Sequence, residues 1–420
     1  MTRPLRVLLI GRHFWPHGSI DSANHLTELA CAFQRAGVHV EVVTPRYASS
    51  WPEELMVREV SVHRPAAAPR SEWSMGRYVR HLSTWLRQHA GGFDVWMVDA
   101  IRDEAMAAID AAKSHEIPVI VRAGGWGIES DAVWWQSSRS ARKCLSTGKQ
   151  ADAVVAISAI HQRDLIAEGY SPDRVHRIEE GFVPLPPRSA RARHLARAAL
   201  ARVNADLAAA DDAPVLMCAS RMTRDGGVNL LVRAAPHLIA KYPQLRIWFI
   251  GDGPYRDWIY ENLRSEGVRA SIAMPGSFCD HGDLYAAADL FLQPDESGLD
   301  YFLRSAIASE LPIVSLDTPA TRAVIDGGLR RSPSPTGAPS KQPESPYVQW
   351  VSGGTAKQIR LGLVEAFEHA TTTQLMASEL RRFVLRTRPW SESVQAYLKL
   401  MESLVRRRRP DHPSSMKAVS

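Results

Sequence analysis

The chain has 420 residues, of which 45% are hydrophobic and 23% are charged. This composition is ordinary for a globular protein, and the length allows two or three domains. The net charge is +6, and part of the excess lies in the basic run 406–409. No zinc-binding spacing, RNA-binding aromatic motif or helix-turn-helix pattern accompanies this charge, so the sequence predicts no nucleic-acid partner.

Cysteine spacing and hydrophobicity exclude further classes of protein. The 4 cysteines lie far apart, so neither a metal site nor a disulfide framework is expected. No long apolar stretch precedes the first strand, and no run reaches the roughly 20 apolar residues of a membrane span. We expect a cytoplasmic protein. The run 406–409 is then either a solvated tail or a peripheral contact with anionic lipid at the inner face of the membrane.

Strands and helices alternate through the first half of the chain. Expected strands are 7–10, 38–43, 95–98, 118–122 and 153–157, and expected helices are 22–36, 103–114, 138–149 and 159–168. The first strand, helix and strand form a βαβ unit, in which parallel strands are joined by a right-handed crossover. Repetition of this unit predicts a doubly wound parallel sheet.

The pattern breaks at the proline-rich segment 184–187 and then starts again. After an Ala/Arg-rich helix, 189–209, the expected strands are 215–219, 245–250, 270–273, 289–292 and 312–315, and the expected helices are 228–241, 255–266, 282–287 and 301–309. The sequence therefore predicts an α/β protein with two Rossmann-like domains, residues 1–187 and 188–388. A ligand would bind in a cleft at the carboxyl ends of the strands.

Three segments differ from this alternation. Residues 328–346 are rich in Gly, Pro and Ser, which predicts a flexible surface loop. Residues 389–406 carry an apolar stripe at helical spacing and predict an amphipathic helix. Residues 407–420 predict a disordered basic tail.

The turn at 220–227, the Gly-Asp-Gly-Pro motif at 251–254 and the segment 285–312 follow one another in a recognisable order. Their spacing resembles the nucleotide-sugar domain of family 4 glycosyltransferases of the GT-B fold. The resemblance implies a nucleotide-diphosphate sugar as co-substrate, no bound cofactor and no required metal. It also implies retaining transfer of a hexose to a glycan or lipid-linked acceptor in polysaccharide or glycoconjugate biosynthesis. In that family the C-terminal helix, here 389–406, crosses back to the first domain.

Sugar transfer from such a donor needs positive charge near the departing diphosphate, because negative charge grows there. Arg221 matches the arginine of the family's strand-to-helix turn, and Gly226 occupies its lysine position. Arg224, on the same turn, could reach the phosphates instead, since a guanidinium suits phosphate oxygens. We predict that Arg221 and Arg224 are catalytic; the alternative is that both are surface turn residues.

The donor site differs most from the family at its two glutamate positions. Alignment places Ser297 and Ser305 there, so both carboxylates are absent. A serine can still form a hydrogen bond with a hydroxyl, and Asp295, Glu296 or Asp300 could take over after a small shift of the loop. The predicted donor-binding residues are Gly18, Ser19, Gly251, Gly253, Ser277, Phe278, Glu296, Ser297, Gly298 and Ser305. One alternative is an inactive scaffold that binds a nucleotide sugar weakly or partners another transferase. Another is a sugar-phosphate epimerase or a phosphorylase.

The acceptor is expected on the first domain. The predicted residues follow the strand 118–122 and are Arg122, Gly124, Glu129 and Asp131. Gly124 stands where many family members carry histidine. The neighbouring pair Trp134-Trp135 allows two interpretations, a platform for a sugar ring or a helix that packs against the partner domain.

Overall fold

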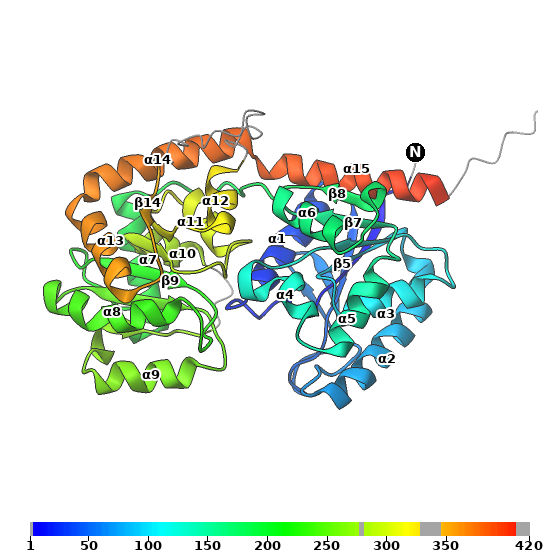
Figure 1. Ribbon diagram of the computed structural model, residues 1–420, viewed down its shortest axis with the longest axis horizontal. Coiled ribbons are helices and arrows are strands. Elements are labelled where there is room, and N and C mark those ends of the chain that lie inside the picture. Colours follow the sequence, from blue (N-terminus) through cyan, green and yellow to red (C-terminus); the bar gives the residue numbers. More distant parts are fainter. Residues whose placement is uncertain (1–2, 277–280, 328–345, 409–420) are drawn as a thin grey trace, which may run out of the picture.

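The computed structural model describes residues 3–276, 281–327 and 346–408. Two α/β domains stand side by side, and each has a central sheet between layers of helices (Figure 1). The expected architecture of two Rossmann-like parallel-sheet domains is confirmed. Ser277, Phe278, nearly all of the expected loop 328–346 and the tail from 409 onwards lie outside the described residues.

The first sheet has the strand order β3-β4-β2-β1-β5-β6-β7-β8. Neighbouring strands are parallel, except that β3 and β4 pair antiparallel at one edge. The strands are β1 (Arg6–Ile10), β2 (His39–Val43), β3 (Glu54–Val57), β4 (Val60–His63), β5 (Val95–Asp99), β6 (Val119–Arg122), β7 (Ala153–Ala156) and β8 (Val175–Arg177). Residues 7–10 of β1 are buried on both faces of the sheet, which explains an apolar side chain at every position.

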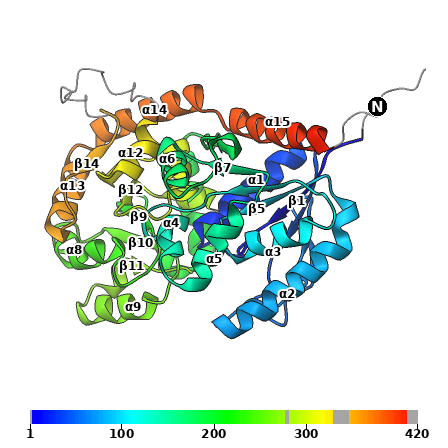
Figure 2. The ribbon, with the colours of Figure 1, turned by 45° about the vertical axis from the view of Figure 1, so that its right-hand side comes forward.

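Helices cover both faces of this sheet. Helix α1 (Asp21–Arg35) and the C-terminal helix α15 (Trp390–Arg408) pack on one face, and α2 (Glu72–His89) and α3 (Asp103–Ala112) pack on the other (Figure 2). The remaining helices are α4 (Asp131–Trp135), α5 (Arg139–Gly148) and α6 (Ala159–Ala167).

The second sheet is entirely parallel, with the order β11-β10-β9-β12-β13-β14. Its strands are β9 (Val215–Ala219), β10 (Arg246–Ile250), β11 (Ile272–Ala273), β12 (Leu290–Gln293), β13 (Ile313–Leu316) and β14 (Gln349–Val351). The chain moves outward from β9 in one direction through β10 and β11, and in the other through β12. The strand order reverses between β9 and β12, and such a reversal creates a crevice at the carboxyl ends of these two strands.

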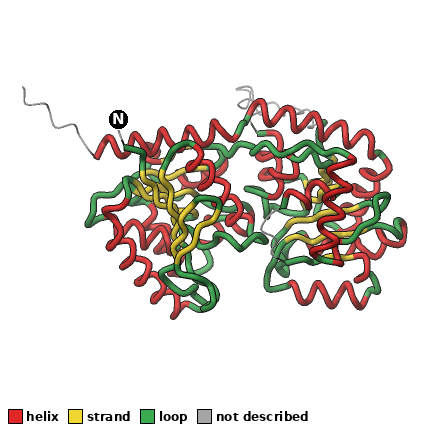
Figure 3. Tube along the Cα trace, turned by 180° about the vertical axis from the view of Figure 1, so that it is seen from behind, coloured by secondary structure: helices red, strands yellow, loops and turns green. Residues whose placement is uncertain are grey.

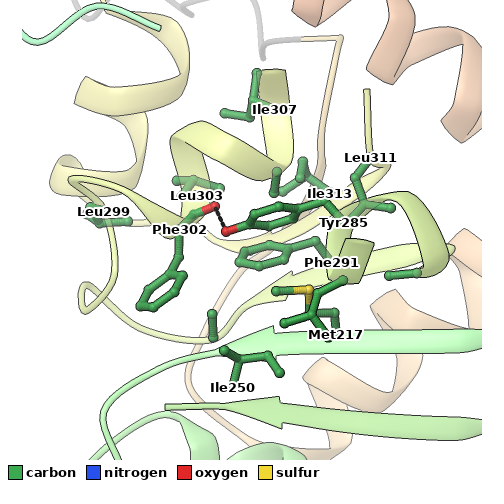
Figure 4. Packing of buried hydrophobic residues seen from close by; sticks show 14 of the residues in the cluster. Met217, Ile250, Tyr285, Phe291, Leu299, Phe302, Leu303, Ile307, Leu311 and Ile313 are labelled. Carbon is green, nitrogen blue, oxygen red and sulfur yellow. Dashed lines mark hydrogen bonds between the residues drawn. The ribbon is translucent and has the colours of Figure 1, made fainter. Parts of the chain in front are cut away.

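The helices of the second domain again form two layers. Helices α8 (Val228–Lys241), α9 (Arg256–Ser265) and α13 (Ala356–Glu368) share one core; α7 (Ala190–Val203), α10 (Gly282–Ala287), α11 (Phe302–Ala308), α12 (Pro319–Asp326) and α14 (Ala370–Thr387) share the other. Tyr285, Phe291 and Met217 pack beneath α11 (Figure 4). The Tyr285 hydroxyl donates to the Phe302 carbonyl at 3.2 Å, which fixes the start of α11 over the sheet.

The chain passes between the domains twice, and the two connecting segments lie next to each other, near Phe182 and near Pro389. The Phe182 N–H donates to the Arg388 carbonyl at 2.9 Å, and the Trp390 N–H donates to the Phe182 carbonyl at 3.2 Å. Beyond this pair, α15 lies along the first domain (Figure 3), where the buried Tyr397 meets the Phe33 ring of α1. β8 ends at Arg177 and β9 begins at Val215, so the proposed boundary between 187 and 188 lies between the two sheets.

The structure adds elements that the sequence analysis did not predict, namely β3, β4, α2, α4, β8, α12, β14, α13 and α14. β3 has only 4 residues and exposes Glu54 and Met56, and α2 buries only Tyr78, Leu82, Ser83 and Leu86, so their apolar patterns are weak. Residues 407 and 408 continue α15, so the expectation that the disordered tail begins at 407 was wrong. In the described part of the chain, no helix combines the length and apolarity needed to cross a bilayer.

Candidate active site

A cavity of about 500 Å³ lies between the domains. Its walls are the loops that follow β1, β5 and β6 in the first domain and β9, β10 and β12 in the second. The lining residues are Arg12, His13, Ser19, Ile20, Asp21, Ser22, Met75, Asp99, Ala100, Arg102, Asp103, Glu104, Arg122, Gly124, Gly125, Glu129, Trp134, Ser220, Arg221, Asp252, Gly253, Gly298, Asp300 and Phe302. This volume suits a small-molecule ligand, and the position is the one expected for twin α/β sheets.

Arg221 lies at the mouth of this cavity. Its side chain is 53% exposed, and its Nη1 approaches Glu129 Oε1 of the opposite domain at 3.3 Å. The Arg221 N–H donates to Ser297 Oγ at 3.3 Å, and that hydroxyl lies 2.9 Å from Ser220 Oγ. Burial raises the pKa of Glu129, although the positive charge of Arg221 opposes the rise. The guanidinium therefore borders the cavity with a single carboxylate beside it.

Arg224, the other predicted cation, has a different environment. It is exposed and does not line the cavity. Its carbonyl accepts a hydrogen bond from the Asn229 side chain at 2.7 Å, which ties the loop to the first turn of α8. The structure thus brings Arg221 into the cleft and leaves Arg224 in solvent.

The glycines of the 251–254 motif allow two backbone segments to touch. Gly251 and Gly253 have φ angles of +145° and +159°. A Cβ on Gly253 would lie 2.2 Å from the Met222 carbonyl oxygen, and one on Gly251 would lie equally close to that of Ser220. Only Gly253 also lines the cavity. Close packing between the loops after β9 and β10 is therefore sufficient to explain the two glycines, without a ligand.

The loop after β12 is held by Asp295. Its carboxylate accepts hydrogen bonds from the Ser220 hydroxyl at 3.0 Å, the Gly227 N–H at 2.7 Å and the Ser297 N–H at 2.9 Å. Gly298, with φ of +74°, lines the cavity. These contacts join the turn at Arg221 to the loop at Gly298.

Several predicted donor residues lie away from this cavity. Glu296 borders a separate cavity of about 320 Å³ and lies against Gly127. Ser305 is buried in α11. Gly18 lines another cavity, of about 470 Å³, which Tyr285 and Tyr301 of the second domain also line, whereas the neighbouring Ser19 lines the cavity of about 500 Å³.

Arg122 forms a buried charge cluster at the floor of the cleft. It is 1% exposed and contacts Asp99 and Glu180 of its own domain at 3.0 Å each, and Asp300 of the other domain at 2.9 Å. The Trp126 indole N–H donates to Asp300 at 2.7 Å. Burial works against ionisation of Asp300, but the Arg122 charge outweighs it and holds the Asp300 pKa below its usual range. Arg122 thus fixes one domain against the other.

Of the other predicted acceptor-side residues, some line the cavity and one is buried behind its wall. Glu129 and Gly124 line the cavity. Asp131 is buried and accepts hydrogen bonds from the Ile101 N–H at 2.7 Å and the Gly124 N–H at 2.9 Å, so it organises the wall from behind.

The two tryptophans of the pair have different surroundings. Trp134 lines the cavity, with the Arg102 guanidinium 5.4 Å above its ring. Trp135 is buried in the core and donates to the Ile101 carbonyl at 3.0 Å.

Asp21 is the most informative residue that the sequence analysis missed. It begins α1, and its carboxylate accepts hydrogen bonds from the backbone N–H groups of Asp300, Tyr301 and Phe302 at 2.9, 3.0 and 2.9 Å. Burial raises the pKa of Asp21, and the negative charge of Asp300 adds to the rise. An acidic residue directly after the Gly18-Ser19 loop was the available signal.

Further cleft residues come from the first domain. Arg12 pairs with Glu104 and lies 3.5 Å from Asp103. His13 stacks on Tyr47 with ring centroids 5.5 Å apart, and burial together with His17 lowers its pKa. Within residues 3–276, 281–327 and 346–408, no three His, Cys, Asp or Glu side chains form a metal-binding group.

The paired sheets and the cleft between them have the architecture of the GT-B fold. Residues 22–181 match the family described as Glycosyl transferase 4-like domain, and residues 213–339 match Glycosyl transferases group 1. Together the matches cover about two thirds of the chain. The chain therefore belongs to the family 4 glycosyltransferases.

Curated relatives align over part of their length. The chain is 28% identical over 230 residues to D-inositol 3-phosphate glycosyltransferase 1 of Catenulispora acidiphila, covering 51% of this chain and 52% of the relative. It is 27% identical over 232 residues to a GDP-mannose-dependent alpha-(1-6)-phosphatidylinositol monomannoside mannosyltransferase of Mycolicibacterium smegmatis, covering 50% and 57%. The chain thus spans about half the length of these relatives.

Solved structures align over nearly the whole chain. Sucrose-phosphate synthase from Thermosynechococcus elongatus has a TM-score of 0.69 at 16% identity, covering 95% of this chain and 99% of that one. HepE of Anabaena in complex with UDP-glucose has a TM-score of 0.68 at 13% identity, covering 95% and 100%. At these identities the similarity shows the shared fold.

Proposed function

We propose that this protein transfers a sugar from a nucleotide-diphosphate sugar to an acceptor hydroxyl in polysaccharide or glycoconjugate biosynthesis. The single observation that carries the proposal is Arg221, a half-exposed guanidinium beside a cavity of about 500 Å³ between two α/β domains. A diphosphate leaving group needs a cation at this place, and a preorganised cation in a cleft is a large catalytic contribution.

The second domain would hold the donor and the first domain the acceptor. Arg221 would contact the diphosphate, and Gly253 and Gly298 would let the backbone approach it closely. Trp134 offers an aromatic face on the acceptor wall, with Glu129 as a hydrogen-bond acceptor for a hydroxyl. Arg224 is less well placed than Arg221, because it would have to turn inward from solvent.

The chemical step breaks the bond between the anomeric carbon and the diphosphate oxygen and forms a bond to the acceptor oxygen. The hydroxyl proton leaves with the nucleoside diphosphate, so charge and atoms balance. We propose transfer of a hexose with retention of the anomeric configuration and without a required metal or bound cofactor. These points rest on the family.

The identity of donor and acceptor is a narrower proposal. One curated relative is named for GDP-mannose and another acts on an inositol phosphate, while HepE is described in complex with UDP-glucose. UDP- and GDP-hexoses are therefore the first donors to test, with a glycan or lipid-linked acceptor. We also propose a cytoplasmic location with peripheral lipid contact through Arg406 and Arg407, which lie at the exposed basic end of α15.

An inactive scaffold is the second candidate. Ser297 and Ser305 replace the carboxylates expected from the family, and Ser305 lies buried away from the cavity. Under this alternative the cleft binds a nucleotide sugar weakly or serves a partner transferase.

The test is release of nucleoside diphosphate from a panel of UDP-, GDP- and ADP-hexoses, with glycans and lipids of a cell extract as acceptors. We expect release from at least one donor, and a product whose anomeric configuration by NMR matches that donor. Arg221→Ala is the matched negative control. Absence of release from every donor, although a nucleotide binds, would favour the scaffold.

A further inference from the structure

His13 differs from the other ionisable side chains of the cavity wall in its contacts. The ionisable residues that line the cavity are Arg12, His13, Asp21, Asp99, Arg102, Asp103, Glu104, Arg122, Glu129, Arg221, Asp252 and Asp300. Within the described part of the chain, each of these side chains except His13 forms an ion pair or a hydrogen bond. The wall therefore holds one imidazole whose hydrogen-bonding groups are left for a ligand.

The His13 ring is fixed by its aromatic neighbours. It stacks on Tyr47 with ring centroids 5.5 Å apart and an angle of 24° between the planes, and it meets the edge of His17 at 5.4 Å. Burial raises the pKa of Tyr47, so this neighbour is uncharged. Among the described residues, Nε2 of His17 is buried without a partner, whereas neither ring nitrogen of His13 is. The half-buried His13 ring thus keeps nitrogen surface that a molecule in the cavity can contact.

The charges that act on His13 come from both domains and are positive. Burial lowers the pKa of His13 most, and His17, Arg12, Arg102 and Arg221 lower it further. Arg12 lies on the same loop, Arg102 follows β5, and Arg221 follows β9 of the second domain. The empty cavity therefore contains a neutral imidazole close to three guanidinium groups.

An anion in this cavity would reverse the electrostatics at His13. A nearby negative charge favours the charged form of an imidazole, and a protonated imidazole donates from both nitrogens. Hydrogen bonds between a cation and a phosphate oxygen are roughly twice as strong as neutral ones. An uncharged sugar acceptor would supply no such charge, so the protonation of His13 distinguishes the two kinds of ligand.

We propose that His13 binds the diphosphate of the donor from the first-domain wall and takes up one proton from solvent as it does so. The inference rests on the proposed function, because it takes the ligand to be a nucleoside diphosphate. His13 and Arg221 would then hold the same group from opposite domains. Since the complex carries more protons at His13 than the free protein does, lowering the pH favours the complex.

The test compares His13→Gln and His13→Phe with the parent chain. Gln keeps a hydrogen-bond donor but does not titrate, whereas Phe keeps the stack on Tyr47 and removes both nitrogens. His39→Gln is the control, because His39 pairs with Glu41 on the surface of the same domain. Dissociation constants for UDP, GDP and inorganic pyrophosphate are measured by calorimetry between about pH 6 and about pH 8, the range in which histidine titrates. Repeating the titration in buffers of different ionisation enthalpy counts the protons taken up.

Near pH 8 we expect His13→Gln to bind pyrophosphate within about twofold of the parent, because His13 is neutral there in the free protein. Towards pH 6 the parent should gain about tenfold in affinity over His13→Gln, and it should take up more protons than that variant. Titration of the ligand itself, of Asp21 or of Glu129 also changes the affinity, but these changes are common to parent and variant and cancel in the ratio.

His13→Phe should bind about tenfold more weakly than the parent near pH 6, as expected for the loss of a hydrogen bond to a charged group. His39→Gln should follow the parent at every pH. If His13 only packs against Tyr47, His13→Phe will bind like the parent and all forms will share one pH profile, which would overturn the inference. If His13→Phe does not fold, the pH profile of His13→Gln decides the question.

Sugar transfer separates this inference from the proposed function. Proton-linked binding that depends on His13, without transfer by the parent, supports the role of His13 and contradicts the transferase. Transfer by the parent, with one pH profile of binding for parent and variants, supports the transferase and overturns the role of His13. If the parent binds none of the three probes, both are contradicted.

Discussion

Arginine–carboxylate ion pairs occur at both the floor and the mouth of the interdomain cleft, but their surroundings differ. At the floor, Arg122 is 1% exposed and contacts three carboxylates. At the mouth, Arg221 is 53% exposed and contacts one. Burial and multiple partners make the first group a permanent joint, whereas exposure and a single partner leave the second available to a ligand. The burial of an interdomain ion pair and the number of its partners therefore indicate whether the pair is structural or available to a ligand.

The largest effect is expected for Arg122→Met. This change removes the cation and leaves the carboxylates of Asp99, Glu180 and Asp300 buried without it, which should cost about 3–5 kcal/mol in the free energy of unfolding. Urea denaturation measures the loss. Lys113→Met is the control, because its pair with Asp110 is exposed, and it should cost no more than about 1 kcal/mol. Similar losses in both variants would contradict the distinction between floor and surface.

Glu180→Gln should lower the free energy of unfolding by about 2 kcal/mol at neutral pH, as expected for a hydrogen bond to a charged group. Burial opposes ionisation of Glu180, but His25 and Arg122 more than offset this and hold its pKa well below its usual range. Such a group stabilises the fold above its unfolded pKa and loses that contribution as pH falls towards its folded pKa. The difference between variant and parent should therefore shrink below about pH 4. A difference that grows in acid would contradict the cluster as described.

Trp126→Phe tests the indole contribution to the joint. The Trp126 N–H donates to the ionised Asp300, whereas the Trp135 N–H donates to a neutral carbonyl. We expect a loss of about 2 kcal/mol for Trp126→Phe and about 1 kcal/mol for Trp135→Phe. The reverse order in thermal or urea unfolding would show that Asp300 does not depend on this donor.

Glu129→Gln should have the smallest effect on stability. The pair at the mouth is partly exposed, so the free energy of unfolding should change by less than about 1 kcal/mol. Denaturation in parallel with Arg122→Met gives the comparison directly. A loss as large as that at the floor would place Glu129 in the permanent joint instead.

The sequence predicted the fold because its strands are apolar runs separated by helical patterns, as in β1, β9 and β10. It predicted Arg221 because this residue matches the arginine of the family's strand-to-helix turn, and the structure places Arg221 beside the cavity. It could not predict the contact of Asp21 with Asp300, since these residues are 279 positions apart and belong to different domains.

The loop after β12 shows a different limit. Glu296 and Ser297 are neighbours, yet Glu296 borders a separate cavity, while Ser297 bonds to the turn at Arg221. One step along the backbone reverses the direction of a side chain, and the positive φ of Gly298 alters the path further. Alignment to a family pattern fixes the loop but not which side chain enters the cleft.

The most direct test of the account is the affinity of the nucleoside diphosphate for the parent chain, Arg221→Ala and Arg224→Ala, measured side by side. Both arginines lie on one loop and both changes remove one positive charge, but only Arg221 lines the cleft. We expect Arg221→Ala to weaken binding about tenfold or more, and Arg224→Ala to bind within about twofold of the parent, since a hydrogen bond to a charged group contributes roughly 1.5–3 kcal/mol. Equal affinity of the parent and Arg221→Ala would contradict a diphosphate site in this cleft.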